Sequence, residues 1–224
     1  MTIELDGSSL TRSQVIQIAC EGSDVSLSPE ALVRVRRAAD FLAEKVSCGE
    51  PVYGVTTGFG SNADKLLGAH RVRDELHGGS AGQRDGTTLL EELQHNLLIT
   101  HAVCVGEPLA VDVVRAMLAI RINTLLRGHS GIRVSTLEAL TALLNRNVIP
   151  VIPAKGSVGA SGDLAPLSHL AIVLLGGGEA FVDGERVSGA EAIRRVGIEP
   201  IRLSFKEGLA LNNGTTRSEE RRVG

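Results

Sequence analysis

The stretch Gly156–His169, which reads GSVGASGDLAPLSH, decides how this chain folds and what chemistry it can carry. Its first half is a glycine-rich turn, and its second half enters an apolar helix predicted over residues 164–175. Asp163 stands where a helix N-cap is expected, because its carboxylate can accept hydrogen bonds from free backbone N–H groups. Such a turn before a helix can bind an anion, so phosphate binding is the first hypothesis.

Two familiar glycine-rich motifs do not fit this turn. A P-loop needs Gly-Lys-Ser/Thr at its end, whereas Lys155 precedes the turn. A nucleophile elbow needs a glycine at the position of Asp163. By form alone, a glycine turn before a helix is more often structural than catalytic.

A different chemistry suits the tripeptide Ala160-Ser161-Gly162. Small residues on both sides of Ser161 let the backbone fold tightly, and Gly162 has no side chain to block its nitrogen. Attack of that nitrogen on the Ala160 carbonyl, with loss of water, would close a five-membered ring. Loss of the Ser161 hydroxyl would then leave an exposed methylene, which is an electrophile made from the chain itself.

Composition limits the remaining possibilities. The 224 residues fit one large domain or two small ones, and the net charge of −3 gives no electrostatic case for nucleic acid or an anionic membrane. No apolar run is long enough for a membrane span, and the N-terminus has no secretion signal. Three scattered cysteines favour neither a disulfide framework nor a zinc site. We therefore expect a cytoplasmic globular protein with no metal, no nucleic-acid partner and no membrane partner.

Most of the chain is predicted to be helical. Besides residues 164–175, helices are predicted over residues 29–48, 88–105 and 112–126, and after a capping box formed by Ser135 and Glu138. A short β-hairpin is expected around Asp183-Gly184, and Ser188 should cap a short helix that ends at Gly197. Residues 70–87 are polar and glycine-rich, so they are predicted to form a surface loop.

At Ala160-Ser161-Gly162 the chain resembles the aromatic amino acid ammonia-lyases, the family of histidine and phenylalanine ammonia-lyases. The resemblance implies that this tripeptide becomes a methylidene-imidazolone (MIO) prosthetic group, with no metal and no nucleotide. It extends over roughly residues 7–216. Three further segments follow in the family's order: Tyr53–Gly60 (YGVTTGFG), Arg127–Gly131 (RGHSG) and Glu207–Thr215 (EGLALNNGT).

The same resemblance assigns roles to individual residues. Tyr53 would be the catalytic base, and a tyrosinate is a stronger base than a carboxylate or an imidazole. Asn213 would touch both the substrate and the prosthetic group. The order Thr100-His101-Ala102 resembles histidine lyases, so His101 would contact the substrate ring. The remaining expected substrate-binding residues are Thr100, Gly60 and Leu164.

Glycines at positions 54, 58 and 60 would let backbone amides approach an ionised phenol on Tyr53. Two features depart from the histidine-lyase pattern. The loop over residues 70–87 is longer than in typical histidine lyases, and Asn212 stands where the family usually has an apolar residue.

These inferences predict a mainly α protein with the ammonia-lyase (fumarase/aspartase-like) fold. Residues 1–204 would form the N-terminal MIO-bearing domain with its hairpin, residues 205–216 the start of an incomplete central helical bundle, and residues 217–224 an atypical charged tail. The expected activity is elimination of ammonia from an aromatic L-amino acid, with histidine to urocanate preferred. The alternatives are a phenylalanine or tyrosine lyase, a 2,3-aminomutase, or an inactive truncated chain. A homotetramer is expected of the complete chain.

Overall fold

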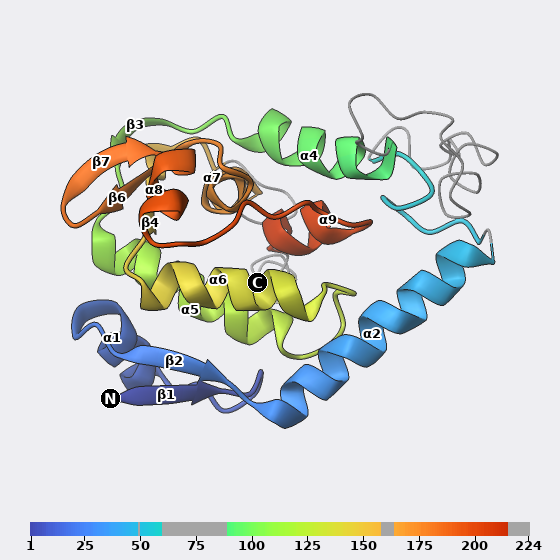
Figure 1. Ribbon diagram of the computed structural model, residues 1–224, viewed down its shortest axis with the longest axis horizontal. Coiled ribbons are helices and arrows are strands. Elements are labelled where there is room, and N and C mark those ends of the chain that lie inside the picture. Colours follow the sequence, from blue (N-terminus) through green and yellow to red (C-terminus); the bar gives the residue numbers. More distant parts are fainter. Residues whose placement is uncertain (49, 60–88, 158–163, 215–224) are drawn as a thin grey trace, which may run out of the picture.

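Figure 1 shows the computed structural model, which describes residues 1–48, 50–59, 89–157 and 164–214. Ala160, Ser161, Gly162, Gly60 and Asp163 lie outside the described residues, as do the predicted loop over residues 70–87 and the tail. The helices are α1 Arg12–Cys20, α2 Pro29–Ser47, α4 Leu89–His101, α5 Val111–Leu125, α6 Val134–Asn145, α7 Leu164–Ile172, α8 Gly189–Arg195 and α9 Glu207–Asn212. The strands are β1 Thr2–Leu5, β2 Asp24–Leu27, β3 Val105–Pro108, β4 Ile149–Pro150, β5 Pro153–Lys155, β6 Glu179–Val182 and β7 Glu185–Ser188.

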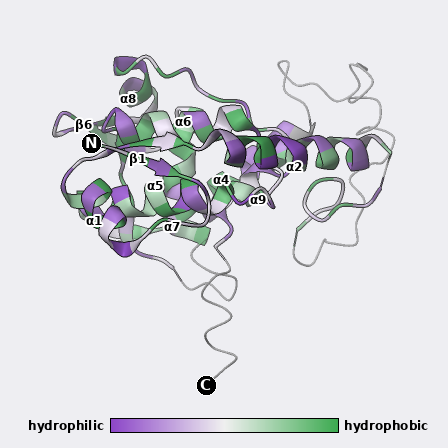
Figure 2. Ribbon diagram, turned by 90° about the horizontal axis from the view of Figure 1, so that it is seen from below, coloured by the Kyte–Doolittle hydropathy of each residue, from purple (hydrophilic) through white to green (hydrophobic). Residues whose placement is uncertain are grey.

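Helices α5 and α6 form the middle of the molecule. In Figure 1 they lie between the N-terminal unit of β1, α1 and β2 and a second layer that contains α4, α7, α8 and the β4-β6-β7 sheet. The core contains fully buried side chains from both helices, among them Leu118, Ile122, Leu137 and Leu140. Figure 2 shows hydrophobic residues concentrated in these central helices, whereas α2 alternates between hydrophilic and hydrophobic residues. The predicted mainly helical fold is confirmed.

The N-terminal unit was not predicted from the sequence. Strands β1 and β2 pair in parallel across α1, which begins with a capping box between Thr11 and Gln14. The side chain of Asn145 in α6 attaches this unit to the core. Its Oδ1 accepts from Val25 N at 2.9 Å, and its Nδ2 donates to Val25 O at 2.8 Å. One asparagine thus extends the backbone bonding of β2 into the helical layer.

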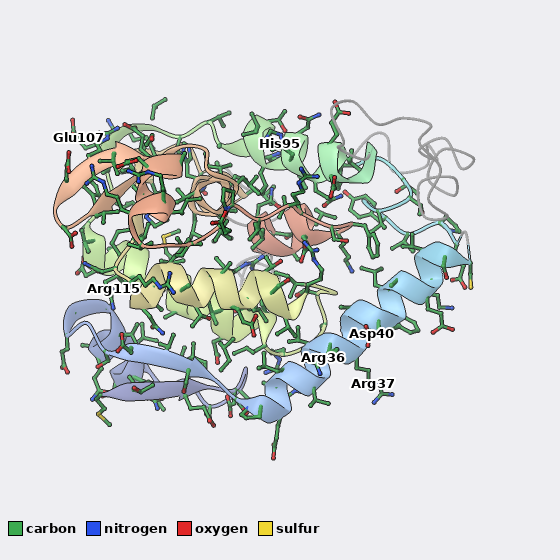
Figure 3. The ribbon with its side chains drawn as sticks, viewed as in Figure 1. Arg36, Arg37, Asp40, His95, Glu107 and Arg115 are labelled. Carbon is green, nitrogen blue, oxygen red and sulfur yellow. The ribbon has the colours of Figure 1, made fainter. Side chains whose placement is uncertain are left out.

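Arg115 joins the same two layers from inside the core (Figure 3). Its Nε donates to Ile18 O at 2.9 Å, and its Nη1 donates to Asn147 Oδ1 at 2.9 Å. Burial lowers the pKa of the guanidinium, because the low-dielectric surroundings disfavour its charge. Figure 3 shows the contrast with α2, where Arg36, Arg37 and Asp40 project from the exposed surface.

Several local predictions are confirmed. Helix α2 begins at Pro29, and the hairpin turns at Asp183 (φ 52°) and Gly184 (φ 80°), as a two-residue turn with positive φ requires. The Ser188 hydroxyl caps α8 by accepting from Glu191 N at 3.3 Å. Each of these features depends on neighbours in the sequence.

Two predicted boundaries are wrong. Helix α4 ends at His101 rather than at Val105, because residues 105–108 instead pair as β3 with β5. The predicted capping box of Ser135 and Glu138 does not start α6, which begins at Val134 without a side-chain cap bond from its N-cap residue, Arg133. A carboxylate from much later in the chain bonds to the start of this helix.

The carboxylate belongs to Glu207, the first residue of α9, whose side chain is fully buried. Its Oε1 accepts from Arg133 N at 3.0 Å and from Thr136 Oγ1 at 2.7 Å. Its Oε2 accepts from Arg133 Nη2 at 2.7 Å and from Ser204 N at 2.7 Å. Glu207 therefore joins the N-cap residue and the first turn of α6 to the start of α9.

Among the helices that the structure describes, none combines the length and apolar character needed to cross a bilayer.

We predict that Glu207→Gln lowers the free energy of unfolding by about 2 to 3 kcal/mol, because it leaves a cluster of donors without a full negative charge. Urea unfolding followed by circular dichroism measures this value. Glu179→Gln is the matched control, since Glu179 pairs with Arg186 on the surface, where both side chains are about half exposed. Equal effects of the two substitutions would contradict the central role of Glu207.

Candidate active site

The loop that carries Tyr53 has a tightly bonded backbone. Val52 N donates to Thr56 Oγ1 at 2.7 Å, and Thr56 Oγ1 donates to Glu50 O at 3.0 Å. Val55 is fully buried against Leu42 and Val46 of α2. The Tyr53 side chain itself is 50% exposed, so the loop holds a phenol at the surface on a fixed backbone.

Gly54 is required where it stands. Its φ of +66° is unfavourable for other residues, and a Cβ at this position would lie 2.4 Å from Leu209 Cδ1 and 2.4 Å from Phe59 Cε1. The Phe59 ring in turn meets the Tyr53 ring edge to face, with centroids 6.1 Å apart. Gly54 N donates to Thr57 Oγ1 at 3.2 Å, so this amide has an acceptor within the loop itself.

His101 is the last residue of α4 and is half-buried. Its Nδ1 lies 2.8 Å from Leu97 O, a carbonyl that can only accept, so the bond requires a proton on Nδ1. In the neutral ring this leaves Nε2 as an acceptor. The neighbouring Thr100 is exposed, and its hydroxyl donates back to Asn96 O at 2.8 Å within the helix.

Asn212 and Asn213 lie at the end of α9. Asn212 is fully buried, and its Nδ2 donates to Ser168 Oγ of α7 at 3.2 Å. Asn213 N donates to Leu209 O at 3.0 Å. The Oδ1 atoms of both asparagines are buried without a hydrogen-bond partner among the described residues. Asn212 therefore replaces the expected apolar residue with a polar link between two helices.

A buried guanidinium lies against the same helix. Arg121 of α5 donates through Nη2 to Ala210 O, and its Nε has no partner among the described residues. Burial lowers the pKa of Arg121 to about 10. Several buried polar atoms thus lie at the end of α9 without a full set of hydrogen bonds, and buried atoms of this kind normally have partners.

Helix α7 begins at Leu164, which is half-buried. Its His169 Nε2 accepts from Cys104 N at 3.1 Å, which joins α7 to the segment just after His101. Burial lowers the pKa of His169 below its ordinary value and raises that of the Cys104 thiol. Both shifts favour the uncharged forms around this contact.

Gln94 of α4 connects these segments, and the sequence analysis missed it. It is fully buried, and its Nε2 donates to Gly54 O at 3.1 Å while its Oε1 accepts from Gly208 N at 3.0 Å. A signal was present, because Gln94 stands four residues after Leu90 and three before Leu97, on the apolar face of the predicted helix. A glutamine at such a position needs internal partners.

The structure thus brings together the segments that carry Tyr53, His101, Asn213 and Leu164. In Figure 1, α9 lies between α4 and α6, and α4 and α9 both pack against α7. The described links run through Gln94, Ser168 and His169. Within the described ranges, no group of three or more His, Cys, Asp or Glu side chains could hold a metal ion.

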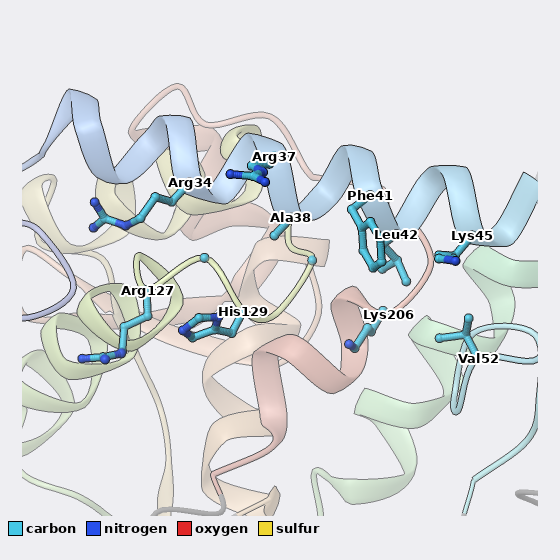
Figure 4. Close-up of a pocket in the computed structure, with 12 residues that line it drawn as sticks. Arg34, Arg37, Ala38, Phe41, Leu42, Lys45, Val52, Arg127, His129 and Lys206 are labelled. Carbon is cyan, nitrogen blue, oxygen red and sulfur yellow. The ribbon is translucent and has the colours of Figure 1, made fainter.

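A separate groove of about 620 Å³ lies between α2 and the segment at residues 127–131 (Figure 4). Its lining is basic: Arg34, Arg37, Lys45, Arg127 and Lys206 contribute to it. None of the predicted site residues lines it. The groove is therefore separate from the place where the Tyr53 loop, α4 and α9 meet.

We predict that stability falls as the pH drops below 6.5, the ordinary pKa of histidine, in part because of His169. The unfolded chain binds a proton there that the folded chain, with its lowered pKa, does not. His169→Gln keeps an acceptor for Cys104 N and cannot titrate. It should therefore flatten the dependence of the unfolding free energy on pH below 6.5. Parallel pH profiles for the two proteins would contradict this assignment.

The chain is similar to known proteins over most of its length. The family model described as aromatic amino acid lyase matches residues 10–219. A histidine ammonia-lyase of Symbiobacterium thermophilum is 50% identical over 209 residues, which are 93% of this chain and 38% of that protein. The chain thus spans little more than a third of the length of this relative.

Solved structures show the same fold. The crystal structure of histidine ammonia-lyase from Trypanosoma cruzi matches with a TM-score of 0.80 and 38% identity, covering 96% of this chain and 38% of that one. A tyrosine aminomutase from Streptomyces globisporus matches with a TM-score of 0.81 and 36% identity, covering 96% and 37%. The fold is therefore that of the aromatic ammonia-lyases and aminomutases. The chain belongs to the aromatic amino acid lyase family.

Proposed function

We propose that this chain provides part of the active site of an enzyme that eliminates ammonia from an aromatic L-amino acid, with histidine as the preferred substrate and urocanate as the product. The observation that carries the proposal is the convergence of the Tyr53 loop, α4 and α9 on Gln94, within the span that matches the family. The resemblance to the family extends the proposal to a homotetramer of the complete protein. We also propose that this enzyme is cytoplasmic. Residues 1–204 would form its MIO-bearing domain, and residues 205–216 would begin its central bundle.

The proposal includes an MIO group formed from Ala160, Ser161 and Gly162. The Oδ1 atoms of Asn212 and Asn213 lack partners among the described residues, so each can accept a hydrogen bond from a donor such as the substrate amine. When formed, the group would supply an electrophilic methylene that activates the amino acid for loss of its amine. Asn213 is the residue expected to hold the group and the substrate together.

Tyr53 would remove the proton from the β-carbon of the substrate. Its phenol is half exposed, while Gly54 and the threonines of the loop fix its backbone. This combination allows a base to reach a substrate without moving the loop that carries it. The rigid backbone also lowers the entropy that is lost when base and substrate align.

His101 supports histidine as the substrate. Its Nδ1 proton is used by Leu97 O, so Nε2 of the neutral ring can accept a hydrogen bond from the N–H of a substrate imidazole. A phenyl ring offers no such donor. Gly60, Thr100 and Leu164 complete the proposed substrate contacts. The Thr100 hydroxyl donates to Asn96 O, so it would take part as an acceptor.

The proposed function has three alternatives. The match to a tyrosine aminomutase favours a second candidate, a 2,3-aminomutase, which would return ammonia to the adjacent carbon. A phenylalanine or tyrosine lyase would use the same residues. An inactive chain is the alternative of another class, since this sequence covers 38% of a histidine ammonia-lyase that it resembles.

Intact mass spectrometry tests formation of the prosthetic group. We expect the mass of the chain to be lower than its sequence mass by two water molecules, because ring closure and loss of the Ser161 hydroxyl each remove one. Ser161→Ala cannot lose the second water, and it should also abolish release of ammonia by the complete protein. An unmodified mass would contradict maturation of this chain by itself.

Substrate choice is tested by incubating the complete protein with histidine, phenylalanine and tyrosine and following the conjugated products by absorbance. We expect urocanate to dominate. His101→Leu should lower kcat/KM for histidine by about 100-fold, because the hydrogen bond to the imidazole is lost, with a much smaller effect on phenylalanine. His95→Gln is the control, since His95 is exposed on the same helix (Figure 3). Cinnamate or coumarate without urocanate would overturn histidine as the substrate, and a β-amino acid would indicate an aminomutase.

A further inference from the structure

Gln94 is a buried amide that uses both of its polar atoms on segments far from it in the sequence. The Nε2 bond reaches Gly54, 40 residues earlier, and the Oε1 bond reaches Gly208, 114 residues later. No part of the side chain is exposed. Glutamine is needed here because one partner is an acceptor and the other a donor, and a neutral amide supplies one of each.

Neither of the two backbone groups that Gln94 binds is bonded within a helix or a strand. Gly208 lies in the first turn of α9, where backbone N–H groups lack an intrahelical acceptor. Gly54 O lies in the irregular Tyr53 loop. An apolar side chain at position 94 would leave both groups buried and unsatisfied, at a cost greater than the loss of one ordinary bond.

Shape supports the same contact from the side of α9. A Cβ at position 208 would lie 2.8 Å from Gln94 O and 3.0 Å from Gln94 Oε1, so only glycine allows α4 and α9 to approach this closely. A Cβ at position 54 would meet Leu209, the next residue of α9. The two glycines and Gln94 therefore form one close-packed junction.

The junction adjoins the segments that carry the proposed reactive groups. Gly54 follows Tyr53 directly, and α9 is a six-residue helix that leads to Asn213. His101 stands seven residues after Gln94, which is about two turns along the same face of α4. A displacement at Gln94 would therefore change the spacing of all three.

We propose that Gln94 is a positioning residue that holds Tyr53, His101 and Asn213 in register. This inference rests on the proposed function in taking these three residues as the site. Gln94 makes its bonds to backbone atoms, so it acts on the reaction only through the segments that it joins.

Three substitutions separate the two bonds. Gln94→Glu keeps an acceptor for Gly208 N and loses the donor to Gly54 O. Gln94→Leu loses both bonds with little change in size. Gly208→Ala forces α9 away from Gln94 without altering the amide. Asn96→Ala is the matched control, because Asn96 is exposed two residues further along α4.

The chain has a single tyrosine and no tryptophan, so its tyrosine fluorescence reports Tyr53 alone. We expect Gln94→Glu and Gln94→Leu to lower the fluorescence anisotropy of Tyr53. Hydrogen exchange measured by mass spectrometry should speed up about tenfold at residues 50–59 in both variants, the amount expected from losing one buried hydrogen bond. Residues 207–214 should speed up in Gln94→Leu and Gly208→Ala, but not in Gln94→Glu.

Wild-type exchange and anisotropy in both Gln94 variants would overturn the proposal. Uniformly faster exchange along the whole chain, with no excess in these two segments, would also overturn it by making Gln94 an ordinary core residue. These measurements require no turnover. In the complete protein we expect Gln94→Glu to lower kcat with little change in KM, since it disturbs alignment rather than substrate binding. A wild-type protein that forms no product would instead count against the proposed function.

Discussion

The rest of the structure depends on the hydrogen bonds that surround the buried carboxylate of Glu207. A charge without solvent must be surrounded by donors, and Glu207 obtains them from two backbone amides, a hydroxyl and a guanidinium. These donors belong to the start of α6 and to Ser204. The carboxylate thereby fixes where α9 begins, and a six-residue helix has little stability of its own without such a constraint.

Local features of this fold were predictable from the sequence, whereas long-range ones were not. The Asp183-Gly184 turn and the Ser188 cap follow from residues within a few positions of each other. The start of α6 was mispredicted because the nearby Ser135 and Glu138 suggested a capping box, while the actual acceptor is Glu207, more than 70 residues away. Sequence spacing carries no information about a partner that only the tertiary fold supplies.

The candidate site shows the same division. Tyr53, Asn213 and His101 could be proposed from short motifs, because a motif records which residue types occur together. Short motifs do not show which polar groups already have hydrogen-bond partners inside the fold. The Gly54 amide donates to Thr57 Oγ1, and the Thr100 hydroxyl donates to Asn96 O, each within its own segment. Which acceptor a donor takes depends on the folded backbone, which a motif does not record.

The polar character of the site follows from where its helices end. His101 ends α4, Asn213 follows the last residue of α9, and Leu164 begins α7. Backbone groups at helix ends lack intrahelical partners, so three converging ends provide many unsatisfied donors and acceptors in an otherwise apolar interior. Gln94 satisfies a free backbone N–H at the other end of α9, on Gly208, and Asn212 bonds to the Ser168 side chain of α7. The atoms left without partners lie at the end of α9, because there the described residues supply fewer partners than the buried polar groups require.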